Sequence, residues 1–162
     1  MVKKNTCVFI SGKGTNLKNL IYRSRDNSFP IKISLVICNN KTANGINYAK
    51  KYKINFICLA GYMKIISSNL IKNYQKKIIN IHPSLLPKFK GLNTFSRILK
   101  NKEVKTGCTV HYVSEKLDSG NIINRKVFFI KSKDSELILK KKTQKLEYQA
   151  FPEAIIKIFR NI

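Results

Sequence analysis

Acidic residues are scarce in this chain. Three aspartates and five glutamates stand against 27 lysines and five arginines, and the formal net charge is +24 over 162 residues. Tryptophan is absent, and only two histidines are present. Because carboxylates and imidazoles are so few, each one is a candidate for a specific structural or chemical role.

Long apolar runs are also missing. No run approaches the roughly 20 residues of a membrane-spanning helix, and the apolar stretch at 7–10 ends at Ser11-Gly12, too short for a signal peptide. The sequence therefore predicts a cytoplasmic protein with no membrane partner. Its 162 residues, 43% of them hydrophobic, suffice for one core, and no linker divides them, so we expect a single domain over residues 1–162.

The four cysteines form no C-x-x-C pair, and three of them lie in apolar, strand-like runs. This pattern is typical of small core residues rather than of disulfides or metal ligands. We therefore expect reduced thiols and no metal. The residues concerned are Cys7, Cys38, Cys58 and Cys108.

The high positive charge raises the question of nucleic-acid binding. Lysines are spread along the whole chain, and Lys, Asn and Ile, which AT-rich codons favour, make up 67 of the 162 residues. Arginine, the residue preferred for base reading and bidentate phosphate contacts, is rare. The composition thus favours codon bias over a selected nucleic-acid surface, and we expect no specific nucleic-acid partner.

Short apolar runs alternate with helical patterns along the chain. Strands are expected at 6–11, 31–38, 56–60, 78–82, 107–114 and 122–130. Helices are expected at 17–24, 44–52, 65–74 and 94–99. A last, long helix is expected from a cap at Asp134 to residue 159, with a kink or break near Pro152. Such alternation predicts an α/β fold with a mostly parallel sheet, in which the last two strands form a pair joined by 116–121.

A glycine-containing loop follows the first strand. Gly14, Thr15 and Asn16 stand where a helix begins, so free backbone N–H groups there can bind an anion. Leu17 occupies the place of the third glycine of a dinucleotide fingerprint, and the Walker pattern is absent. A single phosphate and a plain strand-to-helix turn both remain open.

Two polar residues end the fourth apolar run. Asn80 and His82 are two positions apart on an expected strand, so their side chains point to the same side, and Pro83 marks the carboxyl end of that strand. Ligands of parallel sheets bind beyond such ends. A binding site and a structural hydrogen-bonded pair are both consistent with this pattern. Asp118, in an Asp-Ser-Gly stretch, reads by itself as a turn residue.

Four stretches together resemble the phosphoribosylglycinamide formyltransferase family. They are SGKGTNL at 11–17, LAGYMKIIS at 59–67, NIHPSLLPKFKGL at 80–92 and GCTVHYVSEKLDSGNII at 107–123. The resemblance runs in register from residue 6 to 159. It implies a Rossmann-like sheet with helices on both faces. It also implies transfer of a formyl group from 10-formyltetrahydrofolate, as co-substrate, to the amine of glycinamide ribonucleotide in purine synthesis, with no metal. The resemblance is consistent with either a monomer or an oligomer.

The resemblance also implies roles for individual residues. The catalytic group of the family falls on Asn80, His82 and Asp118. Substrate binding falls on Gly14, Thr15, Asn16 and Glu147. The residues that contact the folate in the family correspond to Met63, Lys64, Ile65, Ile66 and Asn80. In this scheme Asn80 donates to the formyl oxygen, His82 stabilises that oxygen and acts as general acid, and Asp118 favours the imidazolium.

The chain departs from the family at two places. Between Asn55 and Phe56 it lacks a strand and a helix, roughly thirty residues of a strand-plus-helix unit. We therefore expect residues 31–38 at the edge of the sheet, and the helix at 44–52 on the opposite face from the helix at 17–24. Two histidines usual in the family are Asn93 and Phe95 here.

Three other functions remain open. Methionyl-tRNA formyltransferase shares the Asn-x-His-Pro core but carries an RNA-binding domain for which this chain has no room. Formyltetrahydrofolate deformylase shares the three catalytic residues but differs in the residue after the histidine and carries a regulatory domain. A degraded relative that binds ligand without turnover would keep the motifs as well.

Overall fold

The computed structural model describes residues 2–11, 14–38 and 53–160. The described residues form a six-stranded sheet in the order β2-β1-β3-β4-β5-β6. The strands are β1 (Lys4–Ile10), β2 (Ile31–Cys38), β3 (Phe56–Leu59), β4 (Ile78–His82), β5 (Lys105–Tyr112) and β6 (Ile122–Phe129). The helices are α1 (Thr15–Ser24), α3 (Ser68–Asn73), α4 (Thr94–Lys100) and α5 (Glu136–Arg160).

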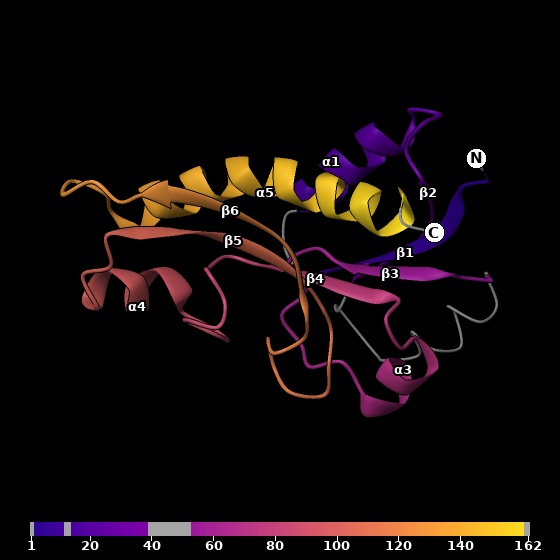
Figure 1. Cartoon of the computed structure of the whole chain (residues 1–162), viewed down its shortest axis with the longest axis horizontal. Coiled ribbons are helices and arrows are strands. Elements are labelled where there is room, and N and C mark those ends of the chain that lie inside the picture. The colour runs from indigo at the N-terminus through magenta and orange to yellow at the C-terminus, as the bar shows by residue number, and fades with distance from the viewer. Residues whose placement is uncertain (1, 12–13, 39–52, 161–162) are drawn as a thin grey trace.

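The sheet is mixed, with its parallel part first in the chain. Strands β2, β1, β3 and β4 are parallel neighbours, whereas β5 and β6 run antiparallel to theirs. Helices α1 and α5 cover one face, and α3 and α4 lie on the other (Figure 1). The expected α/β fold with helices on both faces is therefore confirmed, as is the antiparallel pairing of the last two strands.

Each face of the sheet carries its own hydrophobic cluster. The face toward α1 and α5 includes Leu20, Phe151 and Ile155, all fully buried. The face toward α3 includes Leu70 and Tyr74. The central strand β3 is buried along its whole length because both clusters cover it. No helix in the described part of the chain is long and apolar enough to cross a membrane.

Two helices begin later than the sequence pattern predicts. Helix α3 begins at Ser68 rather than at residue 65, because the Ser67 hydroxyl accepts a hydrogen bond from the Leu70 amide and caps it there. At α5 the capping contact comes from Ser135, whose hydroxyl accepts from the Ile138 amide. Asp134 instead accepts from the Lys131 amide. The predicted Asp134 cap is therefore wrong.

Helix α5 continues through Pro152 without a break. Pro152 is itself buried with its neighbours Phe151 and Ala154 against the sheet. A proline inside a helix removes one hydrogen bond, and this loss is offset here by apolar burial. The helix is therefore not broken at this position.

Strand β2 forms one edge of the sheet, as expected from the missing unit. Its register against β1 shifts between Thr6 and Cys7, so Ser34 is the extra residue of a bulge. Ser34 donates its hydroxyl to Asn5, which satisfies the bulged position. The helix expected at 44–52, and with it the expectation about its face, lies outside the described residues.

Candidate active site

The candidate site lies where β4 ends beside β5. Ile79 and Ile81 of β4 belong to the cluster under α5, so the intervening Asn80 and His82 point to the opposite face. In the antiparallel pair, Asn80 lies opposite His111 and His82 opposite Thr109. Four polar side chains therefore share one patch of the sheet.

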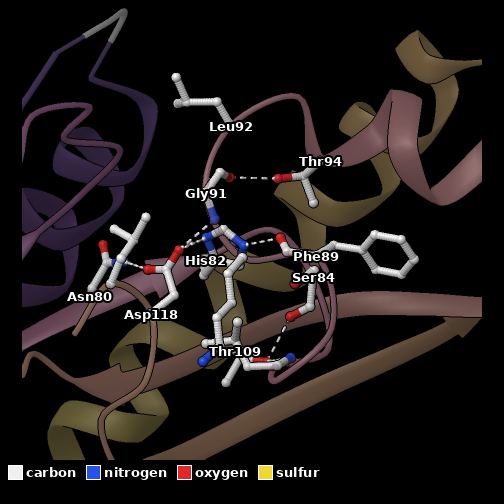
Figure 2. Close-up of polar contacts among 12 residues, drawn as sticks. Asn80, His82, Ser84, Phe89, Gly91, Leu92, Thr94, Thr109 and Asp118 are labelled. Atoms are coloured by element: carbon white, nitrogen blue, oxygen red, sulfur yellow. Dashed lines mark hydrogen bonds and ion pairs between the residues drawn. The ribbon is translucent and has the colours of Figure 1, made fainter.

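His82 is held from both ring nitrogens. Its Nε2 lies 2.8 Å from the carbonyl oxygen of Phe89, and its Nδ1 lies 3.3 Å from Oδ2 of Asp118. A carbonyl oxygen only accepts, so Nε2 carries a proton and donates to Phe89. The side chain is 7% exposed, and the ring is fixed before any substrate arrives (Figure 2).

Asp118 reaches the site from the loop between β5 and β6. Its backbone has a positive φ of 46°, a strained conformation for a residue with a side chain. In return the carboxylate accepts from the Gly91 amide at 2.9 Å and from Nδ2 of Asn80 at 3.4 Å. The turn that the sequence suggested for Asp118 thus aims a carboxylate between β4 and the loop that follows it (Figure 2).

Asn80 turns its amide nitrogen toward acceptors. Nδ2 lies 3.3 Å from Nε2 of His111 and 3.4 Å from Oδ1 of Asp118. Two acceptors on one side require the amide nitrogen rather than the amide oxygen to face them. Asn80 therefore directs its two N–H groups at acceptors at the end of β4, and the one on the longer contact to Asp118 can exchange to an oxyanion.

Burial governs the charge of His82. Burial lowers the pKa of His82 below its usual value, and the Asp118 carboxylate and the Phe89 carbonyl raise it only in part. The expected effect of Asp118 is therefore present but is outweighed by the loss of solvent. An imidazolium held in this way gives up its proton more readily than one in water, which suits a general acid.

Asp118 stays ionised in the same surroundings. Burial works to raise the pKa of Asp118, but contacts with His111 and the Gly91 amide and the charge of His82 lower it to about 2. Since its usual value is 3.8, the carboxylate is negative throughout the neutral range. The site therefore contains a fixed anion beside a ring that can take up a proton.

The loop after β4 is fastened to β5. Thr109 donates its hydroxyl to the Ser84 carbonyl and accepts from the Leu86 amide. Ser84 in turn donates to the Lys88 carbonyl at 2.7 Å. These contacts bring the Phe89 carbonyl to His82 although Phe89 has a positive φ of 57°.

Arg97 of α4 holds the far side of this loop. Its Nη1 donates to the Lys90 carbonyl at 2.6 Å. Its guanidinium also lies over the Phe89 ring, 5.7 Å from the ring centre. Arg97 thereby supports the backbone that accepts from His82.

The predicted substrate residues meet at a seam between α1 and α5. Gly14 stands at the N-cap of α1 with φ 67°. A Cβ added there would lie 3.7 Å from Ile10 Cδ1, so the backbone angle, not space, favours glycine. Asn16 donates to Glu147 at 2.9 Å, and Thr15 accepts from Gln144 at 2.8 Å. The structure therefore brings Gly14, Thr15, Asn16 and Glu147 together.

One polar atom of this seam has no partner. Asn16 is 7% exposed, and within the described residues its Oδ1 makes no hydrogen bond. Burial raises the pKa of Glu147, and the hydrogen bond from Asn16 lowers it only in part. The seam thus presents a buried acceptor and a carboxyl that gives up its proton reluctantly.

The residues predicted to contact folate divide into two groups. The side chains of Met63 and Ile65 are 67% and 84% exposed, and the Met63 amide donates to the Ser11 hydroxyl at 2.8 Å. Ile66 instead packs into the core with Leu70 and Tyr74 of α3. The Ile66 side chain is therefore not available to a ligand.

A groove of about 870 Å³ runs between α3 and the loop that leads to Asp118. Its lining includes Ile71 of α3 and Val113, Ser114 and Glu115 of the loop, but not residues 63–66. Its volume lies in the usual range for small-molecule sites. Its lining also contains none of Asn80, His82 and Asp118, so the groove does not open onto the polar cluster.

Sequence reasoning missed three residues of the site, namely Thr109, His111 and Arg97. Thr109 and His111 are two apart on an alternating strand, which was the available signal, but the pairing of β5 with β4 sets them opposite His82 and Asn80. That register was not readable from the chain. For Arg97 no local signal existed, because its contacts depend on the loop before it.

Known proteins resemble this chain in sequence and in structure. The sequence pattern of the family described as Formyl transferase matches residues 46–155. The chain belongs to the formyl transferase family. It is therefore a formyltransferase by descent, as the sequence predicts.

Individual relatives agree with this family. The chain is 34% identical, over 94% of its length and 85% of the relative, to phosphoribosylglycinamide formyltransferase of Haemophilus influenzae. It is 34% identical to the trifunctional purine biosynthetic protein adenosine-3 of Gallus gallus, covering 94% of this chain but 18% of that protein. The crystal structure of phosphoribosylglycinamide formyltransferase from Bacillus halodurans superposes with a TM-score of 0.90 at 29% identity, covering 96% and 95% of the two chains.

The alignment with the Haemophilus influenzae protein includes more positions than this chain supplies. It spans 181 positions, yet 94% of a 162-residue chain is fewer. The relative therefore carries residues with no counterpart here, in agreement with the expected missing unit. The chain also spans less than a fifth of the trifunctional relatives, 18% in the Gallus gallus protein.

Proposed function

We propose that this protein transfers the formyl group of 10-formyltetrahydrofolate to the amine of glycinamide ribonucleotide, as a single domain in the cytoplasm. The observation that supports this most strongly is the arrangement around Asp118. A buried imidazole, an amide nitrogen and a carboxylate converge at the carboxyl end of β4. Family membership and the names of the relatives agree with this function.

The proposed reaction forms one bond and breaks another. The amine nitrogen attacks the formyl carbon, and negative charge develops on the formyl oxygen. Asn80 donates an N–H to that oxygen, and the protonated His82 stabilises it by charge. The bond from the formyl carbon to N10 of the folate then breaks as N10 takes a proton from His82. The proton lost by the amine passes to His82 and restores the imidazolium.

Asp118 supports this reaction through His82. The carboxylate lies 3.3 Å from Nδ1 and remains ionised, so it offsets in part the burial that disfavours the imidazolium. The phosphate of the ribonucleotide is assigned to the N-terminus of α1, where Gly14, Thr15 and Asn16 present backbone amides. The folate ring is assigned to the exposed side chains of Met63 and Ile65 and to the loop that leads to Asp118.

The test is a formyl-transfer assay with the purified chain, glycinamide ribonucleotide and 10-formyltetrahydrofolate. We expect formylglycinamide ribonucleotide and tetrahydrofolate in equal amounts. Hydrolysis of the folate without the ribonucleotide would indicate a deformylase, and formylation of methionyl-tRNA alone would indicate the tRNA enzyme. Ligand binding without any product would indicate a relative that has lost turnover.

A further inference from the structure

We propose that His111 is a positioning residue, which fixes the amide of Asn80 so that one N–H is directed at the formyl oxygen. The inference rests on the proposed function and assigns a role to the second of the two histidines of the chain. His111 touches two of the candidate catalytic residues but reaches no open surface, since its side chain is 2% exposed. It is therefore placed to act through its neighbours.

The tautomer of His111 follows from its contacts. Nδ1 lies 2.8 Å from the carbonyl oxygen of Tyr112, which can only accept, so Nδ1 carries the proton. In the neutral ring Nε2 then holds a lone pair. That lone pair lies 3.3 Å from Nδ2 of Asn80 and accepts one of its N–H groups. A backbone carbonyl thus determines which nitrogen of His111 is the acceptor.

This acceptor decides the orientation of the Asn80 amide. With Asp118 alone, one contact at 3.4 Å would have to hold the amide, and the same carboxylate is also shared with His82 and the Gly91 amide. His111 supplies a second acceptor, Nε2, which also lies 3.6 Å from Oδ1 of Asp118. The two N–H groups of Asn80 are thus divided between His111 and Asp118. The one held by the longer contact to Asp118 can exchange to the formyl oxygen while the other stays on His111.

The alternative orientation would abolish the proposed oxyanion contact. If the amide turned over, its oxygen would face the lone pair of His111 and the carboxylate of Asp118, which is electrostatically repulsive. The oxygen would gain no donor, and neither N–H would remain beside Asp118, where the proposed reaction places the formyl oxygen. Misplacement of a catalytic group by one rotation is enough to cost roughly 10- to 100-fold in rate.

Two substitutions separate the role of each ring nitrogen. His111→Gln places an amide oxygen near the position of Nε2 and can still accept from Asn80. His111→Asn reaches the position of Nδ1 but leaves Asn80 without this acceptor. We expect His111→Gln to retain kcat within about threefold of the wild type, and His111→Asn to lose roughly 10- to 100-fold in kcat with little change in KM for either substrate.

A matched control comes from the same strand. Cys108 is fully buried on the opposite face, in the cluster under α5. Cys108→Ala disturbs the packing of β5 without touching the site, so its activity per folded molecule should equal the wild-type value. Equal losses in His111→Gln and His111→Asn, wild-type kcat in His111→Asn, or a loss of the same size in Cys108→Ala would each overturn the role of His111.

A spectroscopic test does not depend on turnover. The chain has two histidines, so nitrogen-15 spectra of the wild type and of His111→Gln assign both rings. We expect the His111 ring to show a protonated Nδ1 and an unprotonated Nε2 at neutral pH. A ring protonated on Nε2 would overturn the inference. A wild-type chain without formyl transfer would instead overturn the proposed function together with the kinetic part of this inference, while the spectra would still decide the tautomer.

Discussion

The polar cluster around Asp118 and the seam between α1 and α5 differ in how fully their polar atoms are paired. In the cluster, both nitrogens of His82 and both oxygens of Asp118 have contacts within the protein. At the seam, Oδ1 of Asn16 is buried without a partner among the described residues. One region is complete before substrate arrives, and the other keeps an unused acceptor.

This difference predicts that the two regions contribute to different kinetic parameters. An unpaired buried polar atom costs about 1–3 kcal/mol, and a hydroxyl or amine of a ligand that donates to Asn16 would remove that cost. A fully paired cluster gains nothing from ground-state binding, but it is aligned for charge that develops during reaction. We therefore expect changes in the cluster to alter kcat and changes at the seam to alter KM.

The largest effect is expected within the cluster. His82→Ala removes both the charge and the general acid, and we expect kcat to fall by about 10³ or more, with Asn80→Ala and Asp118→Ala also far below the wild type. Steady-state kinetics measure the effect, and thermal unfolding shows that the variants are folded. Wild-type turnover in Asp118→Ala would remove that residue from the mechanism.

Acid pH should affect the stability of the cluster through Asp118. Its pKa is about 2 in the folded protein against the usual 3.8, so its contribution to stability is complete above about pH 5 and is lost as pH falls through 2. Wild type should lose about 2 kcal/mol more than Asp118→Asn over this range. Denaturant titrations at several acid pH values measure the difference.

Other acidic residues do not affect this comparison between wild type and Asp118→Asn. Asp26 and Asp134 also have pKa values below the usual range because of hydrogen bonds and nearby cations, but they are present in both proteins. Their effects therefore cancel in the difference between wild type and Asp118→Asn. Parallel stability curves for the two proteins would show that Asp118 is not held as the structure indicates.

At the seam a smaller effect is expected. Asn16→Ala removes the donor to Glu147 and the unpaired acceptor, and we expect KM for the ribonucleotide to rise roughly tenfold with kcat nearly unchanged. Asn19→Ala is the matched control, because Asn19 links α1 to the Tyr148 carbonyl of α5 at the same distance of 2.9 Å. If both variants raised KM alike, the seam would be structural only.

The smallest effect concerns the loop that supports His82. Arg97→Gln removes the donor to the Lys90 carbonyl and the cation over Phe89, so we expect kcat to fall by a few-fold. Arg23→Gln, an exposed arginine at the end of α1, controls for the loss of charge. A change in KM alone would show that Arg97 does not help to position His82.

The sequence predicted part of the site directly. Alternation along a strand places Asn80 and His82 on one side, and both face the same side in the structure. The position of Asp118 beside them came from the family resemblance, because its own stretch indicates only a turn. His111 stayed unassigned, since an alternating strand shows which residues share a face but not what lies opposite them.

Local chemistry also decided the helix ends that the pattern misplaced. A hydroxyl cap at Ser67 moved the start of α3 three residues along the chain, to Ser68. Ser135 rather than Asp134 caps α5, although both residue types are common caps. Periodicity reports which face is buried, and it does not report which of two neighbouring side chains reaches the free amides.

By itself the sequence determined the α/β class, the parallel start of the sheet and the common side of Asn80 and His82, because apolar period and chain order set these features. The edge position of β2 followed from the family resemblance and its missing unit. The tertiary structure alone decided that His111 faces Asn80, that Phe89 accepts from His82, and that burial outweighs Asp118 in setting the pKa of His82. Register and loss of solvent arise from contacts between distant segments, and no local pattern encodes them.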